Sequence, residues 1–196
     1  MRLGFIAGGR RGEADRVLSA FGQGLAERGA SVAGVVQTNV DCGPDRACDM
    51  DVTVLPAGPV IRISQSLGPG ARGCRLDTAE LERAVVAVSE SLAARPGLLI
   101  VNKFGKHEAD GRGFRPLIGE ALALGIPVLT AVNAMNRAAF LGFAEELAEE
   151  LPATEQALDR WYRELAGEGF RRHRNHGKPH AKRSRLRPFE QALSCR

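Results

Sequence analysis

A cluster of polar and charged side chains follows the apolar stretch LLIV in the second half of the chain. Asn102 and Lys103 come first, and Lys106, His107 and Glu108 follow within a few residues. Amide and amine groups can bind an oxyanion, whereas a carboxylate beside a histidine can act as an acid–base pair or hold a metal ion or its water. We therefore take Lys103 and Glu108 as candidate catalytic residues, and Asn102 and Lys106 as candidate anion-binding residues.

A glycine-rich turn near the N-terminus is a second candidate for anion binding. The apolar run LGFIAG leads through Gly8, Gly9, Arg10, Arg11 and Gly12 into a helical pattern. Small residues let backbone N–H groups approach a phosphate, and guanidinium groups suit tetrahedral oxyanions. The turn lacks the Lys and Ser/Thr that complete a P-loop, because Glu and Ala stand there. A plain strand-to-helix turn with solvated arginines is the alternative interpretation.

The segment SLGPGARGCRLD forms a third glycine-rich loop. Arg72 and Arg75 in this loop are further candidates for anion binding. Cys74 lies beside Arg75, and electropositive surroundings lower the pKa of a thiol, so Cys74 is the candidate reactive thiol. Cys42, Cys48 and Cys74 could converge in space, but no C-x-x-C pair indicates zinc, and we predict no metal site from the spacing.

The hydrophobic periodicity predicts an α/β fold whose sheet is mostly parallel and contains an inserted β-hairpin. Ligands of such sheets bind beyond the carboxyl ends of the strands, where the three candidate loops would converge. The predicted strands are 3–8, 31–37, 51–55, 60–64, 97–102 and 125–132, and the predicted helices are about 13–28, 77–94, 114–124, 137–147 and 154–165.

The chain of 196 residues, 44% of them hydrophobic, is long enough for one packed domain, which we place at residues 1–169. Residues 170–196 form a tail that we expect to be disordered, since it has many Lys and Arg residues and few apolar ones. Such a tail could bind nucleic acid or an acidic protein, or could simply increase solubility. No apolar run approaches the roughly 20 residues that span a bilayer, so we expect no membrane insertion and a cytoplasmic location.

Two longer motifs resemble known families. LLIVNKFGKHEADGRGF followed by GIPVLTAV resembles the second half of the small P-loop nucleoside-triphosphatases of the cancer-related type. In those proteins the strand ends in Asp-Glu-Ile-Gly with a Glu soon after, and here Asn102-Lys103-Phe104-Gly105 fills that place, with Glu108 as the later acid. These two segments together with IRISQSLGPGARGCRLD resemble, more closely and over about 2–148, a bacterial family of unknown function whose genes are typically found beside molybdate-transport genes. The resemblance implies a three-layer P-loop NTPase-like fold and a link to molybdenum.

These observations favour a degenerate P-loop-like protein that binds a nucleotide or another oxyanion such as molybdate, as an accessory to bacterial molybdenum uptake or metabolism. Asn102 cannot give Mg²⁺ a negative charge and the P-loop Lys and Ser/Thr are missing, which argues against efficient phosphoryl transfer. Two alternatives stay open. One is an active nucleoside-triphosphatase that uses a nucleotide with Mg²⁺, Glu108 for the metal or water, and Arg10 or Arg11 for phosphate. The other is a non-enzymatic regulatory protein that binds a partner. The oligomeric state is also left open.

Overall fold

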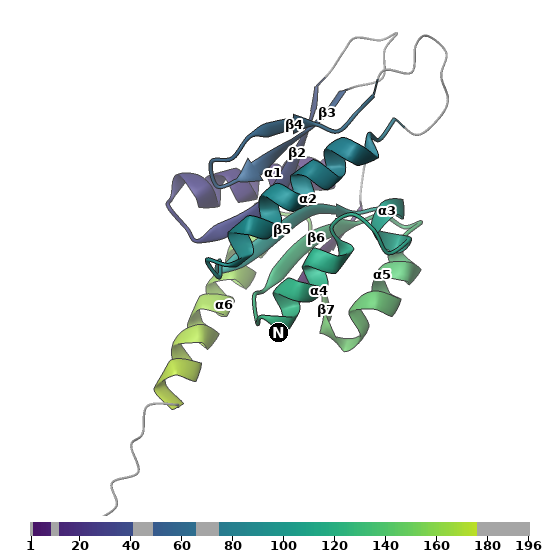
Figure 1. Ribbon diagram of the computed structural model, residues 1–196. Helices are drawn as coiled ribbons and strands as arrows, with labels where there is room; N and C mark the ends of the chain where they lie inside the picture. The colour runs from purple at the N-terminus through teal and green to yellow at the C-terminus, as the bar shows by residue number, and fades with distance from the viewer. Residues whose placement is uncertain (1, 9–11, 41–48, 66–74, 176–196) are drawn as a thin grey trace, which may run out of the picture.

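The computed structural model describes residues 2–8, 12–40, 49–65 and 75–175, and statements about the structure refer to these residues. They form one seven-stranded sheet in the order β4-β3-β2-β5-β6-β1-β7, with helices on both faces (Figure 1). The strands are β1 (Leu3–Ala7), β2 (Val32–Val40), β3 (Asp49–Leu55), β4 (Val60–Arg62), β5 (Leu98–Phe104), β6 (Val128–Val132) and β7 (Ala148–Leu151). The helices are α1 (Glu13–Glu27), α2 (Thr78–Leu92), α3 (Lys106–Ala109), α4 (Arg115–Ala123), α5 (Arg137–Ala144), the 3₁₀ turn η1 (Glu145–Leu147) and α6 (Glu155–Asn175).

The sheet is mostly parallel, as the sequence predicts. Strands β2, β5, β6, β1 and β7 pair in parallel, and the hairpin of β3 and β4 adds to β2 in antiparallel fashion. Strand β7 is absent from the sequence prediction, and the helix predicted for 137–147 ends earlier, at Ala144. Glu145 has a positive φ of 49°, which stops the helix, and the two glutamates of AEEL hide the strand pattern.

Two hydrophobic clusters fill the two faces of the sheet. Residues of α1 and α6, such as Leu18 and Trp161, cover one face, and residues of α4 and α5, such as Ile118 and Phe140, belong to the cluster on the other. Side chains alternate between these faces along each strand. Helix α1 lies close to the sheet because Gly22 has no side chain: a Cβ there would lie 2.8 Å from Cγ1 of Val36.

Strand β2 contains a glycine that the pairing with β5 requires. Gly34 has a φ of 119°, a conformation that side-chain-bearing residues rarely adopt. A Cβ at this position would lie 1.8 Å from the carbonyl oxygen of Ile100 on β5. The central parallel pair of the sheet therefore depends on a residue without a side chain.

Helix α6 corrects the expectation for the first residues of the tail. The helix runs on to Asn175, so the predicted limit at Gly169 falls inside it, and its last turns extend away from the rest of the fold (Figure 1). Residues 176–196, most of the predicted tail, lie outside the described residues. In the part of the chain that the structure describes, no helix has both the length and the apolar character needed to cross a membrane.

Candidate functional site

The three candidate loops leave the sheet at one edge. Strand β4 runs in the same direction as β2, because two antiparallel pairings separate them, and β1 and β5 are parallel to β2 through the rest of the sheet. The turns after β1, β4 and β5 therefore all start at the carboxyl ends of strands that run the same way. Strands β2 and β3 separate β4 from β5, so the predicted convergence of the third loop with the other two stays a prediction. The residues at the centres of two turns, and the cysteines, lie outside the described residues: Gly9, Arg10, Arg11, Arg72, Cys74, Cys42 and Cys48.

A buried polar network ties the start of α1 to this edge. Asp15, in the first turn of α1, is 6% exposed, and Asn102, near the end of β5, is 3% exposed. Asn102 donates from Nδ2 to Oδ1 of Asp15 at 2.9 Å and accepts at Oδ1 from the backbone N–H of Gln37 at 3.0 Å. Asn39 donates from Nδ2 to the other oxygen of Asp15 at 3.4 Å. One side chain on β5 thus links α1 to β2.

The orientation of the Asn102 amide follows from its neighbours. The backbone N–H of Gln37 can only donate, so Oδ1 of Asn102 must face it, and Nδ2 must face the carboxylate of Asp15. Both ends of the amide are therefore occupied, and Asn102 has a positioning role for α1. The structure does not support its predicted direct contact with an anion.

Lys103 lies beside the same carboxylate. Its Nζ is 3.8 Å from Oδ2 of Asp15, and its side chain is 44% exposed. The turn before α1 ends at Gly12, which is the N-cap with a φ of 75° and provides no side chain to cap the helix. A Cβ built at Gly12 would meet no atom of the described residues within 4 Å, so none of these residues fills the space beside this glycine. An exposed amine, a glycine turn and the positive end of a helix dipole therefore lie at the same edge.

Glu108 has a structural role that the sequence did not predict. Its carboxylate is buried, at 4% exposure, and accepts from the backbone N–H of Gly105 at 2.9 Å and of Phe114 at 3.2 Å. Gly113, with a φ of 58°, leaves room for one carboxylate oxygen. Both oxygens thus hold the loop from β5 to α4, and this geometry does not support the predicted role with metal or water.

His107 pairs with α2 and not with its neighbour Glu108. Its Nε2 lies 3.4 Å from Oε1 of Glu82, which also accepts from the backbone N–H of Gly113 at 3.3 Å. The acid–base pair of His107 and Glu108 suggested by the sequence is therefore wrong, because the two side chains bind different partners. Lys106, in the first turn of the short helix α3, is exposed to solvent.

Arg75 is held by an ion pair, contrary to the expectation that its guanidinium would bind an anion. Its Nη2 lies 3.0 Å from Oδ1 of Asp49, and its Nε donates to the carbonyl oxygen of Gln65 at 3.1 Å. The side chain is only 20% exposed. Arg75 therefore joins β3 to the segment after β4, where the backbone of Gln65 and Arg75 is also hydrogen-bonded at 2.8 Å.

Three residues of this site are missing from the sequence prediction. Asp15 is an acid at the start of a predicted helix. From the sequence, this position predicts only a favourable interaction with the helix dipole and repulsion of a phosphate, and no hydrogen bond to Asn102. Gln37 stands at the end of the predicted strand 31–37, and Asn39 falls in the loop predicted after it. The available signal is the spacing of Gln37 and Asn39, which places two amides on the same face of β2. Gly8 stands where β1 leaves the sheet beside β6, and its N–H donates to the carbonyl oxygen of Val132 at 2.8 Å and not toward an anion.

The donor set does not form a metal cage built from the protein alone. Among the residues that the structure describes, no three His, Cys, Asp or Glu side chains are grouped as metal ligands. Asp15 could give one carboxylate oxygen to a Mg²⁺ ion that a nucleotide brings with it, since Mg²⁺ is often held mainly by phosphates and water. The amide of Asn102 would not help, because Gln37 and Asp15 occupy it.

The fold and the helix start at the sheet edge define a P-loop NTPase-like α/β protein. The structure of a human cancer-related nucleoside triphosphatase matches with a TM-score of 0.59 and 16% identity, over 86% of this chain and 97% of that chain. The structure of THEP1 from the hyperthermophile Aquifex aeolicus matches with a TM-score of 0.55 and 11% identity, over 84% of this chain and 96% of that one. At these identities the likeness concerns the fold alone.

The chain itself belongs to the family described as "Protein of unknown function (DUF2478)", whose model matches residues 3–161. A curated relative is the molybdenum import ATP-binding protein ModC 2 of Bradyrhizobium diazoefficiens, 37% identical over 162 residues. That match covers 83% of this chain and 18% of the relative, so this chain corresponds to a small part of a much longer protein. The predicted family resemblance and fold class are thereby confirmed.

Proposed function

We propose that this protein binds a nucleotide phosphate or another oxyanion such as molybdate at the edge formed by the glycine turn, the start of α1 and Lys103. The observation that carries the proposal is the link from Asp15 to Asn102, which fixes the first turn of α1 next to the end of β5. Lys103 follows Asn102 directly, and its amine lies 3.8 Å from Oδ2 of Asp15 in the first turn of α1. The likeness to part of ModC 2 supports a role accessory to molybdate import.

The contact between Lys103 and Asp15 leaves the amine usable by a ligand. The distance of 3.8 Å is long for an ion pair, and nearly half of the lysine side chain is exposed. An oxyanion can therefore approach the amine of Lys103 from the solvent while the amine stays near Asp15. Lys106 is a second exposed amine after β5 and adds positive charge to the same edge.

The carboxylate of Asp15 limits which anions suit the site. It is buried in the first turn of α1, where its negative charge opposes a bare polyphosphate. Anions of low charge, such as phosphate or molybdate, meet less repulsion, as does a nucleotide whose Mg²⁺ offsets its charge. Hydrolysis is not part of the proposal, because Glu108 is occupied by backbone N–H groups.

Thermal unfolding in the presence of ATP with Mg²⁺, GTP with Mg²⁺, phosphate and molybdate tests the proposal. A ligand at ten times its Kd stabilises the folded state by about 1.4 kcal/mol, which raises Tm measurably. We expect at least one of these anions to stabilise the wild-type chain and Lys103→Ala to lose most of that effect. Arg163→Ala is the matched control, since it removes one exposed positive charge from α6.

Three results would contradict the proposal. The first is no stabilisation by any of the four anions at millimolar concentration. The second is equal stabilisation of wild type and Lys103→Ala, which would place the anion elsewhere on the surface. Loss of binding in both Lys103→Ala and Arg163→Ala would indicate a general charge effect and would also reject a specific site.

A further inference from the structure

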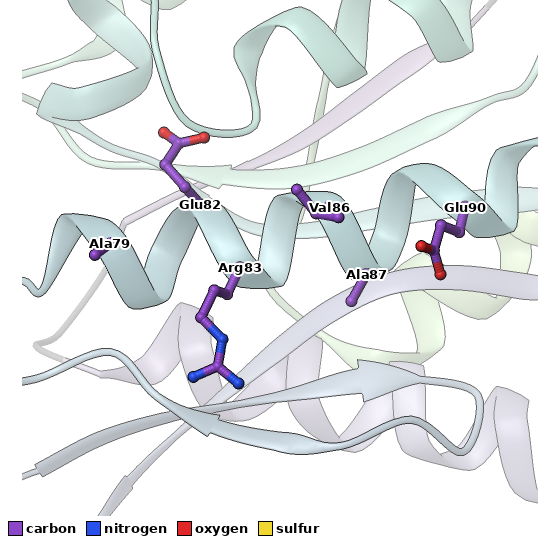
Figure 2. Close-up of a pocket in the computed structure, with 6 residues that line it drawn as sticks. All are labelled: Ala79, Glu82, Arg83, Val86, Ala87 and Glu90. Carbon is purple, nitrogen blue, oxygen red and sulfur yellow. The ribbon is translucent and has the colours of Figure 1, made fainter.

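The outer face of α2 carries a shallow groove that the proposed anion site does not use. Its volume is about 420 Å³, and it is lined by Ala79, Glu82, Arg83, Val86, Ala87 and Glu90. Figure 2 looks onto these side chains, with the strands of the sheet behind the helix. Val86 stands in the middle of the helix and is 59% exposed.

Five of the exposed residues along α2 and its C-cap are spaced for packing against another helix. Ala79, Arg83, Val86, Glu90 and Ala93 follow one another at steps of four, three, four and three residues, and all five are exposed. This is the spacing of a helix–helix seam. The opposite side of the helix already packs on the sheet through Leu81, Ala84, Val88 and Leu92.

The seam is complementary to itself when two copies of the helix run antiparallel. With the two-fold axis between Val86 and Ala87, Arg83 faces Glu90 of the partner subunit, and by symmetry the pair occurs twice. Val86 then faces Ala87 of the partner subunit, so a larger apolar side chain meets a small one. In a parallel pair, Arg83 would meet a second arginine and Glu90 a second glutamate, which is unfavourable.

We propose that α2 is the contact surface of a symmetric homodimer, in which the groove of one subunit takes Val86 of the partner subunit. Arg83 can make this contact, since its bonds to Glu80 at 3.0 and 2.8 Å use only Nη1 and its side chain is 70% exposed. In the described residues Glu90 makes no ion pair, so it can accept the bond. The distal end of Arg83 points toward the hairpin of β3 and β4, and Glu82 points the other way (Figure 2).

The size of this contact sets the expected strength of the dimer. A helix of 15 residues is about 22 Å long, so two such helices bury on the order of 1,000 Å² in total. That area is at the low end for specific interfaces. The dimer is therefore weak and forms as the protein concentration rises. Salt screens the charged pairs and so decreases the fraction of dimer.

Sedimentation velocity of the full chain over a wide range of concentration tests the dimer through a charge exchange. Arg83→Glu alone and Glu90→Arg alone each place like charges opposite one another, so both variants are expected to stay monomeric. The double variant Arg83→Glu/Glu90→Arg restores opposite charges and is expected to dimerise like the wild type. Glu27→Arg, which reverses an exposed charge on α1 at the other face of the sheet, is the matched control.

Both substituted side chains are exposed, so each variant is expected to fold. Far-UV circular dichroism and the Tm of each variant check this. A wild-type chain that stays monomeric at every concentration overturns the proposal. A dimer that persists in both single variants overturns it as well, since the contact then uses another face. If the double variant fails to dimerise although it is folded, the antiparallel arrangement about Val86 and Ala87 is rejected.

Discussion

Replacing Asn102 by Asp tests the network that fixes the start of α1. The substitution keeps the shape of the side chain but puts a carboxylate where Nδ2 now donates to Asp15 at 2.9 Å. The hydrogen bond to a charged group is lost, which costs about 2 kcal/mol, and two buried carboxylates then repel each other by about 4 kcal/mol at an effective dielectric constant near 20. Binding a proton relieves part of the repulsion, so we expect Asn102→Asp to lower the free energy of unfolding by about 3–5 kcal/mol near neutral pH.

The loss depends on pH in a direction that identifies its cause. The two carboxylates of the variant share a proton in the folded state and bind it more tightly than the same groups do in the unfolded chain, where each has a pKa near 4. The destabilisation is therefore small below about pH 4 and increases as the pH rises through the raised pKa of the folded pair. Asn102→Ala also removes bonds from Gln37 and Asp15, but it adds no charge and lacks this extra increase relative to the wild type.

Urea unfolding of the wild type, Asn102→Asp, Asn102→Ala and Asp15→Asn/Asn102→Asp measures the effect at acid and neutral pH. In the double variant, the carboxylate introduced at position 102 can accept from the backbone N–H of Gln37 and from the amide introduced at position 15, so most of the lost stability should return. The reasoning is refuted if Asn102→Asp is as stable as the wild type near neutral pH. It is also refuted if the double variant is less stable than Asn102→Asp, because the two side chains would then not be coupled.

Three further predictions concern other positions. Gly34→Ala should destabilise the fold by about 3 kcal/mol or more, or prevent folding, since its Cβ would collide with the carbonyl oxygen of Ile100, and circular dichroism and urea unfolding measure this. Glu108→Ala should lower the free energy of unfolding by about 2–3 kcal/mol, because two loop N–H groups lose their acceptor. Glu108→Gln keeps one oxygen and should lower it by about half as much. Equal losses for the two variants in urea unfolding would contradict these hydrogen bonds. The hydrogen bond from Arg137 lowers the pKa of Glu150. This pair therefore stabilises the fold at neutral pH, and its small contribution is lost as the pH falls through the lowered pKa. NMR titration of the wild type and of Arg137→Gln should find the Glu150 pKa higher in the variant.

The sequence predicts the sheet well because its central strands are nearly continuous apolar runs. Strand β5 is LLIV followed by polar residues, and the rule that ligand loops follow the carboxyl ends of parallel strands places Lys103 at the edge where the structure has it. Strand β7 escapes prediction because its inward-facing positions are few and two glutamates interrupt them. Its place beside β1 depends on contacts made across the whole sheet, which no local pattern contains.

The site is harder to predict because the same residue types serve opposite purposes. An acid in the first turn of a helix favours the helix dipole wherever it points, so the inward orientation of Asp15 is decided by how α1 crosses β2 and β5. For Glu108 the sequence contained a local signal for its structural role, but we predicted a catalytic role. This glutamate stands three residues after Gly105, the spacing at which a glutamate binds the N–H of the residue before a helix, and this local signal was available.

The hydrogen bonds of Asp15 and Asn102 show how the sheet edge differs from the hydrolase pattern that the sequence resembles. The resemblance places an acid at the end of this strand, but here the strand carries the amide, Asn102, and the acid, Asp15, stands on the facing helix. One negative charge is thus kept at the sheet edge, where it is held by Asn102 and lies near Lys103. Moving the acid back to the strand in Asp15→Asn/Asn102→Asp takes the carboxylate away from the first turn of α1. If the proposed oxyanion site is correct, this double variant binds phosphate or molybdate more tightly than the wild type does, even though its fold is no more stable.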